Sequence, residues 1–308
     1  MTTTLVFGHK APDTDSTGAP LIWAWYLSEM RGEPAEAVLL GAPSSEAAFV
    51  LGHWGVETPR VIDALAPGTP VAIVDTNNPA ELPGTIGEAD IRAIIDHHKL
   101  TGGLSTVAPI EVAIRPLACT VTVMHEAMGA EAAAKMPRAL KGVMLSCILS
   151  DTLEFRSPTT TDTDRALAER LAGELNVEIP AYAAEMFRAK SDVSSFSDAE
   201  LLRMDSKQHA VGGTTFRVSV IETTAPEVIL ARKDGLVAAM EGVATEDGVD
   251  LVLLFIVDIL RGEATLLVPD DPTRTVAEKS FGTAVTGDTV VLPGVMSRKK
   301  QIIPNLTL

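Results

Sequence analysis

Residues 91–99 read IRAIIDHHK, a run of β-forming residues that ends in one aspartate and two histidines. Two earlier segments have the same form: TTLVFGH at 3–9 ends in His9, and TPVAIVDTNN at 69–78 turns polar at Asp75. Stretches of helical composition separate these runs, and such alternation predicts a mostly parallel sheet covered by helices. Ligands of such sheets bind beyond the carboxyl ends of the strands, which is where these polar residues stand.

The length of 308 residues predicts two α/β domains, at about 100–200 residues per domain. Residues 1–188 are expected to form the first domain, its mostly parallel sheet completed by strands near 35–41 and 111–116. The small and polar residues of 189–195 are the predicted linker. Residues 196–308 are expected to form a smaller α/β domain, and each part is long enough to bury its own core.

The chain carries 25 Lys and Arg against 41 Asp and Glu, a formal net charge of −16. Such a charge repels phosphate backbones and anionic membranes, so no nucleic-acid partner and no membrane partner are expected. The sequence has neither an apolar run of the ~20 residues that a membrane span needs nor a signal-peptide pattern. Two cysteines in apolar surroundings, without CxxC spacing, suit a reducing compartment. A cytoplasmic location is therefore predicted.

Histidines and aspartates follow several predicted elements, at positions typical of metal ligands. They are His9, Asp13, Asp15, Asp75, His97, His98 and, at the end of an apolar helix, Asp151. Taken singly, an aspartate in such a loop is more typical of a helix cap or a solvated turn. Taken together, carboxylates and imidazoles without thiolates are ligands for Mn²⁺, Zn²⁺ or Co²⁺. So many carboxylates exceed the needs of one ion and predict two ions about 3.5–4 Å apart.

A cluster of cations stands out against the negative net charge. Ser297-Arg298-Lys299-Lys300-Gln301 follows a strand-like run in the second domain, and Lys207 lies early in that domain. Arginine offers a planar fork for phosphate oxygens and lysine a compact charge, although a solvated basic tail is the alternative. A metal site on one domain and these cations on the other together predict a phosphate site between the domains.

Five motifs resemble those of the DHH phosphoesterase superfamily and, more narrowly, of the family II (manganese-dependent) inorganic pyrophosphatases. They are GHKAPDTDS at 8–16, VDTNN at 74–78, IDHHK at 95–99, SDTLEFRSPT at 150–159 and SRKKQIIP at 297–304. The resemblance runs in order over essentially the whole chain. The first-strand motif at 8–16 and the DHH motif at 95–99 are shared across the superfamily, whereas the last two motifs are much more specific to the pyrophosphatases.

The resemblance implies a role for each candidate residue. One Mn²⁺ would be held by His9, Asp13, Asp75 and Asp151, and a second by Asp15, Asp75, His97 and Asp151. Asp96 would support the histidine pair. The pyrophosphate would contact His98, Lys207, Arg298 and Lys299. The family further implies homodimers and a C-terminal domain that closes over the active site.

One position departs from the family pattern. The family usually has Asp-His-Asn-Glu where this chain has Asp75-Thr76-Asn77-Asn78. The bridging carboxylate is kept and an imidazole is lost, so the change bears on metal preference and on the tuning of the nucleophile. The donor set does not decide between Mn²⁺ and Co²⁺.

The expected reaction is hydrolysis of inorganic pyrophosphate to two orthophosphates by a hydroxide that bridges the two Mn²⁺ ions. Arg298, Lys299 and Lys207, with a Mg²⁺ ion on the substrate, would neutralise the phosphoryl oxygens, and His98 would assist the leaving phosphate. One alternative is a DHH-family phosphodiesterase acting on short oligonucleotides or cyclic dinucleotides. Another is a non-catalytic module that senses phosphate or metal.

Overall fold

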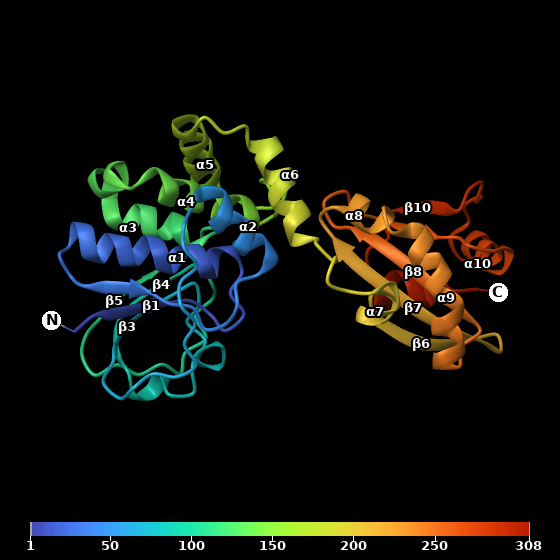
Figure 1. Cartoon of the computed structure of the whole chain (residues 1–308), viewed down its shortest axis with the longest axis horizontal. Helices are drawn as coiled ribbons and strands as arrows, with labels where there is room; N and C mark the ends of the chain where they lie inside the picture. The colour runs from blue at the N-terminus through green and yellow to red at the C-terminus, as the bar shows by residue number, and fades with distance from the viewer. Residues whose placement is uncertain (1, 308) are drawn as a thin grey trace. The chain divides into compact units, whose positions relative to one another are not determined.

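A computed structural model describes residues 2–307 of the chain. The chain divides into two compact units, Met1–Lys190 (unit 1) and Ser191–Leu308 (unit 2). Both units combine a β-sheet with helices (Figure 1). None of the helices within residues 2–307 is long and apolar enough to cross a membrane.

Unit 1 is built on a five-stranded, fully parallel sheet in the order β2-β1-β3-β4-β5. Its strands are β1 (Thr4–Phe7), β2 (Ala35–Ala37), β3 (Pro70–Val74), β4 (Asp90–Asp96) and β5 (Glu111–Ile114). Each lies in a segment where the sequence predicts a strand, so the mostly parallel α/β sheet is confirmed. Every residue of β3 is buried, as expected of a central strand covered on both faces.

The two faces of this sheet are covered in different ways. The helices are α1 (Thr14–Trp25), α2 (Ser45–Trp54), α3 (Thr120–Lys135), α4 (Arg138–Asp151), α5 (Asp162–Leu175) and α6 (Ile179–Lys190). Helices α1 and α3 pack on one face, and α4 packs on α1 (Figure 1). On the other face, Leu82 and Ile86 of an irregular, proline-containing segment pack against Ile73 of β3. There the cover is loop and short 3₁₀ turns rather than the expected helices, because proline interrupts the segment.

The first helix begins well before the Leu21 at which the sequence predicts it. Its N-cap is Asp13, whose Oδ1 accepts a hydrogen bond from the backbone N–H of Ser16 at 2.9 Å. The first turns lack apolar periodicity because they bury polar side chains for the site described below. A Cβ atom on Gly18 would lie 2.5 Å from Sγ of Cys147, so glycine allows α1 and α4 to approach closely.

Unit 2 has a mixed five-stranded sheet in the order β10-β9-β8-β7-β6, in which β7 and β8 are parallel and the other pairs antiparallel. The strands are β6 (Ser206–Val211), β7 (Thr214–Thr223), β8 (Leu251–Asp258), β9 (Glu263–Leu267) and β10 (Thr289–Pro293). The helices are α7 (Asp198–Met204), α8 (Pro226–Leu230), α9 (Lys233–Asp247) and α10 (Asp271–Phe281). The smaller α/β domain that the sequence predicts is therefore present.

Two elements of unit 2 differ from the sequence-based expectation. The segment from Pro226 to Glu241, expected as one helix, is broken into α8 and α9. Strand β6 has no counterpart among the predicted strands, because its sequence SKQHAV is polar and lies half-exposed at the edge of the sheet. The basic residues from Arg298 to Ile302 follow β10 as a π-helical turn capped by Ser297, whose side chain accepts from the N–H of Lys300.

Candidate metal centre

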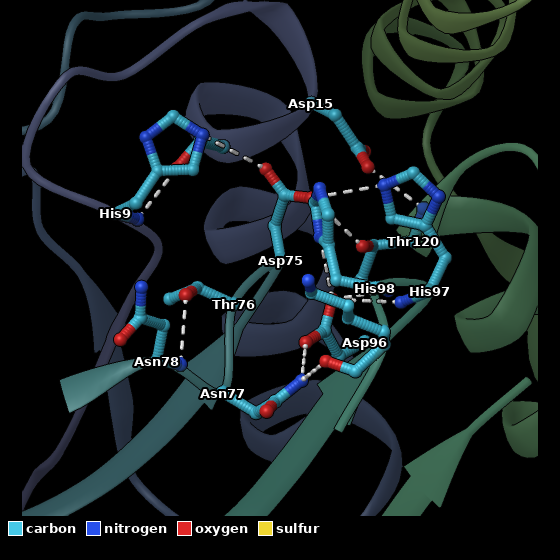
Figure 2. A network of polar contacts seen from close by, with 12 residues as sticks. His9, Asp15, Asp75, Thr76, Asn77, Asn78, Asp96, His97, His98 and Thr120 are labelled. Atoms are coloured by element: carbon cyan, nitrogen blue, oxygen red, sulfur yellow. Dashed lines mark hydrogen bonds and ion pairs between the residues drawn. The ribbon is translucent and has the colours of Figure 1, made fainter. Parts of the chain in front are cut away.

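The carboxyl ends of β1, β3 and β4 are adjacent because these strands are neighbours in the sheet. His9 lies just beyond β1, Asp75 directly follows β3, and Asp96 ends β4 with His97 and His98 next along the chain. Figure 2 shows the imidazoles of His9, His97 and His98 gathered around the carboxylate of Asp75. Strand order therefore assembles, from distant parts of the sequence, residues that the sequence predicts as a site.

The loop after β1 places His9 beside two carboxylates. Its backbone N–H donates to Oγ of Ser16 at 2.8 Å, and a Cβ on Gly8 would lie only 2.0 Å from that Oγ, so this turn requires glycine. The Nε2 atom of His9 lies 3.7 Å from Oδ2 of Asp13 and 3.5 Å from Oδ2 of Asp75. Burial opposes protonation of His9, yet the hydrogen bond with Asp13 and the charge of Asp75 raise its pKa.

Asp75 is the buried centre of the arrangement, with 1% of its surface exposed. Its φ of 56° is left-handed, a conformation that aspartate adopts more readily than most residues and that turns the chain sharply at the end of β3. The Oδ1 atom accepts from Oγ1 of Thr120 at 3.0 Å. The Oδ2 atom is buried and accepts no hydrogen bond from residues 2–307.

The ring of His97 is oriented by the backbone. Its Nδ1 atom lies 3.2 Å from the carbonyl oxygen of Leu117, which only accepts hydrogen bonds, so Nδ1 carries the proton. In the neutral ring, Nε2 then has its lone pair free and lies 3.5 Å from Oδ1 of Asp75. Two acceptors facing each other at this distance are suited to a shared cation.

Asp96 organises the segment that follows β4. It is fully buried, and its Oδ1 accepts from the backbone N–H groups of His97 and His98 and from Nδ1 of His98 at 2.9 Å. Its Oδ2 accepts from Nδ2 of Asn77 at 2.6 Å. The hydrogen bond to Asp96 raises the pKa of His98, although burial and His97 oppose it. The side chain of His98 is half-exposed, and its Nε2 atom makes no hydrogen bond or ion pair within residues 2–307.

Two further carboxylates come from helices. Asp15, in the first turn of α1, is 1% exposed and its Oδ2 accepts from the backbone N–H of Thr120 at 2.7 Å. Asp151 is the last residue of α4. One buried oxygen of each, Oδ1 of Asp15 and Oδ2 of Asp151, accepts no hydrogen bond from the described chain. With Oδ2 of Asp75, three buried carboxylates each have an oxygen without a donor, which strongly disfavours an ion-free site.

The carboxylates also raise one another's pKa. Burial raises the pKa of Asp75 well above its usual value, and the charges of Asp15 and Asp13 raise it further. The pKa of Asp151 is likewise raised well above its usual value, first by burial and then by Asp15 and Asp75. Ionised carboxylates this close and this buried repel one another, and a cation between them removes the repulsion.

Three groups of donor atoms, each within 4.8 Å of one another, have the composition of a divalent-metal site. They are His9, Asp13 and Asp75; Asp15, His97 and Asp151; and Asp75, His97 and His98. Every residue that the sequence predicts as a metal ligand, and the substrate candidate His98, belongs to at least one group. The donors fit hard or borderline divalent ions such as Mn²⁺.

The remaining candidates, Lys207, Arg298 and Lys299, belong to unit 2. Lys207 lies on β6, and both it and Lys299 are exposed. Arg298 is restrained by Asp205: its two terminal nitrogens lie 2.7 Å from the carbonyl oxygen and 2.7 Å from Oδ1 of that residue.

Thr76, which stands where the family usually has histidine, is buried beside Asp75. Its hydroxyl donates to Oε2 of Glu81 at 2.6 Å and accepts from the backbone N–H of Asn78 (Figure 2). The side chain thus fixes the loop after β3. It offers no nitrogen donor to the site.

Sequence reasoning missed two residues that organise the site. Thr120 binds Asp15 through its N–H and Asp75 through its hydroxyl, and Asn77 bridges Asp96 to Thr101. Thr120 lies in none of the quoted motifs, and Asn77, although part of VDTNN at 74–78, is given no role by the resemblance. The available signal is position, because both residues stand just beyond strands at the carboxyl edge of the sheet.

Two domain families match the chain: the DHH family, N-terminal domain, at residues 3–150, and the DHHA2 domain at residues 184–308. A relative from Lactobacillus helveticus, named "Probable manganese-dependent inorganic pyrophosphatase", is 38% identical over 98% of this chain and 97% of its own. A Deinococcus radiodurans relative of the same name is 40% identical, over 98% and 96%. A crystal structure of a Methanococcus jannaschii protein assigned to the family II inorganic pyrophosphatases has a TM-score of 0.60 and 33% identity, covering 97% of each chain.

The fold and the donor set define a divalent-metal protein built on a parallel α/β domain. The chain belongs to the DHH family and, within it, to the manganese-dependent (family II) inorganic pyrophosphatases. The resemblance carried by the sequence motifs is thereby confirmed.

Proposed function

We propose that the protein hydrolyses inorganic pyrophosphate to two orthophosphates at a dinuclear manganese site. One observation carries the proposal: Asp15, Asp75 and Asp151 bury carboxylate oxygens that have no donor in the described chain, beside imidazole nitrogens with free lone pairs. The relatives that share the full length of the chain are named for this activity.

The ligands are proposed to divide into two sets that share Asp75 and Asp151. The first set is His9, Asp13, Asp75 and Asp151, and the second is Asp15, Asp75, His97 and Asp151. Two of the donor groups described above support this division, because each contains the two unshared ligands of one set and one shared carboxylate, Asp75 in the first and Asp151 in the second. Divalent ions held there would lower the pKa of a water molecule between them, so that hydroxide is available near neutral pH.

His98 is proposed to hydrogen-bond the leaving phosphate. Asp96 fixes Nδ1 of His98 and raises its pKa, so that the ring carries a proton over a wider pH range. The free Nε2 then donates to a phosphate oxygen. His97 has its Nδ1 proton held by the carbonyl of Leu117, and it therefore contributes Nε2 as a ligand.

The cations of unit 2 are proposed to contact the pyrophosphate, whose charge is shared with a bound Mg²⁺ ion. Arg298, whose guanidinium is restrained by Asp205, offers its remaining N–H groups, and Lys207 and Lys299 offer exposed charges. In this proposal unit 2 closes over the substrate and excludes water from it.

A phosphate-release assay tests the proposal. The purified chain is given pyrophosphate or a linear dinucleotide, with Mn²⁺, Co²⁺ or Mg²⁺ as the added ion and with a chelator as control. Release of orthophosphate is measured for pyrophosphate, and release of mononucleotides, by chromatography, for the dinucleotide. We expect release from pyrophosphate with Mn²⁺, none after chelation, and none from the dinucleotide. Cleavage of the dinucleotide alone would support the phosphodiesterase alternative. Metal binding without release from either substrate would support a sensing module.

Two further expectations concern location and assembly. The protein is proposed to be cytoplasmic, on the sequence grounds given above, and to be a homodimer, as the family resemblance implies. Sedimentation equilibrium of the metal-loaded chain measures the second property, and a mass of one chain at micromolar concentration would contradict it.

A further inference from the structure

Glu46 is a buried carboxylate that the proposed reaction does not use. It lies in the first turn of α2 and is 1% exposed. Burying a charge is costly unless hydrogen bonds or an opposite charge compensate it. The contacts that compensate Glu46 are therefore informative about its role.

Two hydroxyl groups bind the same oxygen of Glu46. Oγ1 of Thr14 donates to Oε2 at 2.8 Å, and Oγ of Ser150 donates to it at 2.6 Å. Thr14 lies between Asp13 and Asp15, and Ser150 immediately precedes Asp151. One carboxylate oxygen thus joins the start of α1 to the end of α4, the two helix ends that carry three of the proposed metal ligands.

A cation lies beside the same oxygen. Nζ of Lys190 lies 3.4 Å from Oε2 of Glu46, whereas Oε1 is buried and accepts no hydrogen bond from residues 2–307. Lys190 is the last residue of α6 and of unit 1, and Ser191 begins unit 2. The ammonium group therefore stands where the chain leaves the metal-binding unit, and a backbone change at this boundary changes its distance from Glu46.

We propose that Glu46 is a positioning residue for the metal site, and that Lys190 connects it to the chain segment that enters unit 2. Mn²⁺ binding in unit 1 and the conformation of the chain around residues 190–195 then influence each other. Such coupling is reciprocal: the factor by which the conformation of residues 190–195 changes the affinity for Mn²⁺ is the factor by which bound Mn²⁺ shifts that conformational equilibrium. The inference rests on the proposed function only for the presence of the metal site.

Direct Mn²⁺ binding to the full chain, followed by the electron paramagnetic resonance of the free ion, tests the positioning role. In E46Q the amide oxygen accepts from the same two hydroxyl groups, but the charge that pairs with Lys190 is lost and the amide nitrogen takes the place of Oε1, which has no hydrogen-bond partner within residues 2–307. We expect its dissociation constant for Mn²⁺ to rise about 10-fold or more, as for other groups that orient metal ligands. In K190M, which loses an exposed partner, we expect a rise of about 2- to 5-fold.

A control variant and a double variant separate this role from general stability. Arg188 is in the same last turn of α6, and no carboxylate in residues 2–307 forms an ion pair with it, so R188M should bind Mn²⁺ like the wild type. Because Lys190 acts through Glu46, the variant E46Q/K190M should bind no more weakly than E46Q. If the two substitutions multiplied their effects on the dissociation constant for Mn²⁺, the proposal that Lys190 acts through Glu46 would be overturned. Lys190 is exposed, so K190M is expected to fold even if E46Q does not.

Amide hydrogen exchange tests the link to the boundary. Adding Mn²⁺ to the wild type should slow exchange at residues 190–195, and K190M should lose that response while exchange in the sheet of unit 1 is unaffected. Unchanged Mn²⁺ affinity of K190M, or an unchanged exchange response, would overturn the proposal. Failure of the proposed function is distinguishable, since the wild type would then bind Mn²⁺ with this coupling and release no phosphate from pyrophosphate.

Discussion

The metal centre of unit 1 and two lysines of unit 2, Lys207 and Lys299, carry opposite charges and differ in burial and in how firmly their side chains are held. Asp15 and Asp75 are almost fully buried, and Thr120 fixes one oxygen of each. Lys207 and Lys299 are exposed, and within residues 2–307 no ion pair restrains either of them. Charge that holds a metal ion is placed before the ion arrives, because buried carboxylates cannot rearrange through water. A cationic side chain that binds an anion arriving from solution can adopt its position when the anion binds.

Removing the buried centre should have the largest effect. D75N keeps the shape of the side chain and removes a charge that both ligand sets share. We expect kcat to fall by more than the about 10–100-fold that is typical of residues that only orient ligands. The same change should raise the Tm of the chelated protein, because it relieves repulsion with Asp15. Activity and thermal unfolding measure both, and E88Q, an exposed site, is the control.

Substitutions in the turn Arg298–Ile302 should lower activity by different amounts, depending on the residue. R298K keeps the positive charge and loses the planar fork that binds Asp205 and is proposed to bind phosphate. A lost charge-assisted hydrogen bond is worth about 1.5–3 kcal/mol, so kcat/KM for pyrophosphate should fall about 10- to 100-fold. Mn²⁺ affinity should not change. The neighbouring variant K300M should have a kcat/KM close to that of the wild type. An equal loss in both variants would show that Arg298 has no role beyond that of the neighbouring cations.

Stability should depend on pH in opposite directions without and with bound Mn²⁺. The folded-state pKa values of Asp75 and Asp151 are raised, so their contribution to stability is present below about pH 3.9, the unfolded value, and is lost as pH rises through the raised values. Mn²⁺ requires the ionised carboxylates, so its affinity should increase with pH. The difference in Tm between Mn²⁺-loaded and chelated protein should therefore grow toward neutral pH. A constant difference would show that these carboxylates do not titrate on binding.

The smallest effect is expected beside Asp75. T76V removes the hydroxyl that donates to Glu81 and leaves the N–H of Asn78 without its acceptor. We expect a loss of about 1 kcal/mol in the free energy of unfolding, and at most a few-fold change in the preference for Mn²⁺ over Co²⁺. Urea denaturation and activity with each ion measure these. T76S keeps the hydroxyl and should retain the wild-type values.

The sequence predicts the central strands of unit 1 well because β1, β3 and β4 are apolar runs that end abruptly in polar residues. The start of α1 is not predictable in this way, since its first turns bury Asp15 and Ser16 for the site and lack apolar periodicity. Strand β6 is missed because an edge strand needs few apolar residues. The metal ligands form a motif, whereas Thr120 and Glu46 act through contacts with residues far along the chain, which spacing does not encode.

The donors of the metal centre are spread along the chain from His9 to Asp151, and only the folded arrangement of the sheet with α1 and α4 brings them together. An unfolded chain therefore has no comparable site, and Mn²⁺ binds the native state almost exclusively. Each tenfold rise in free Mn²⁺ above the dissociation constant adds about 1.4 kcal/mol of native-state stability per ion. In a cell, chains that have not acquired manganese would unfold and be degraded sooner, so manganese supply would set the lifetime of the protein as well as its turnover of substrate.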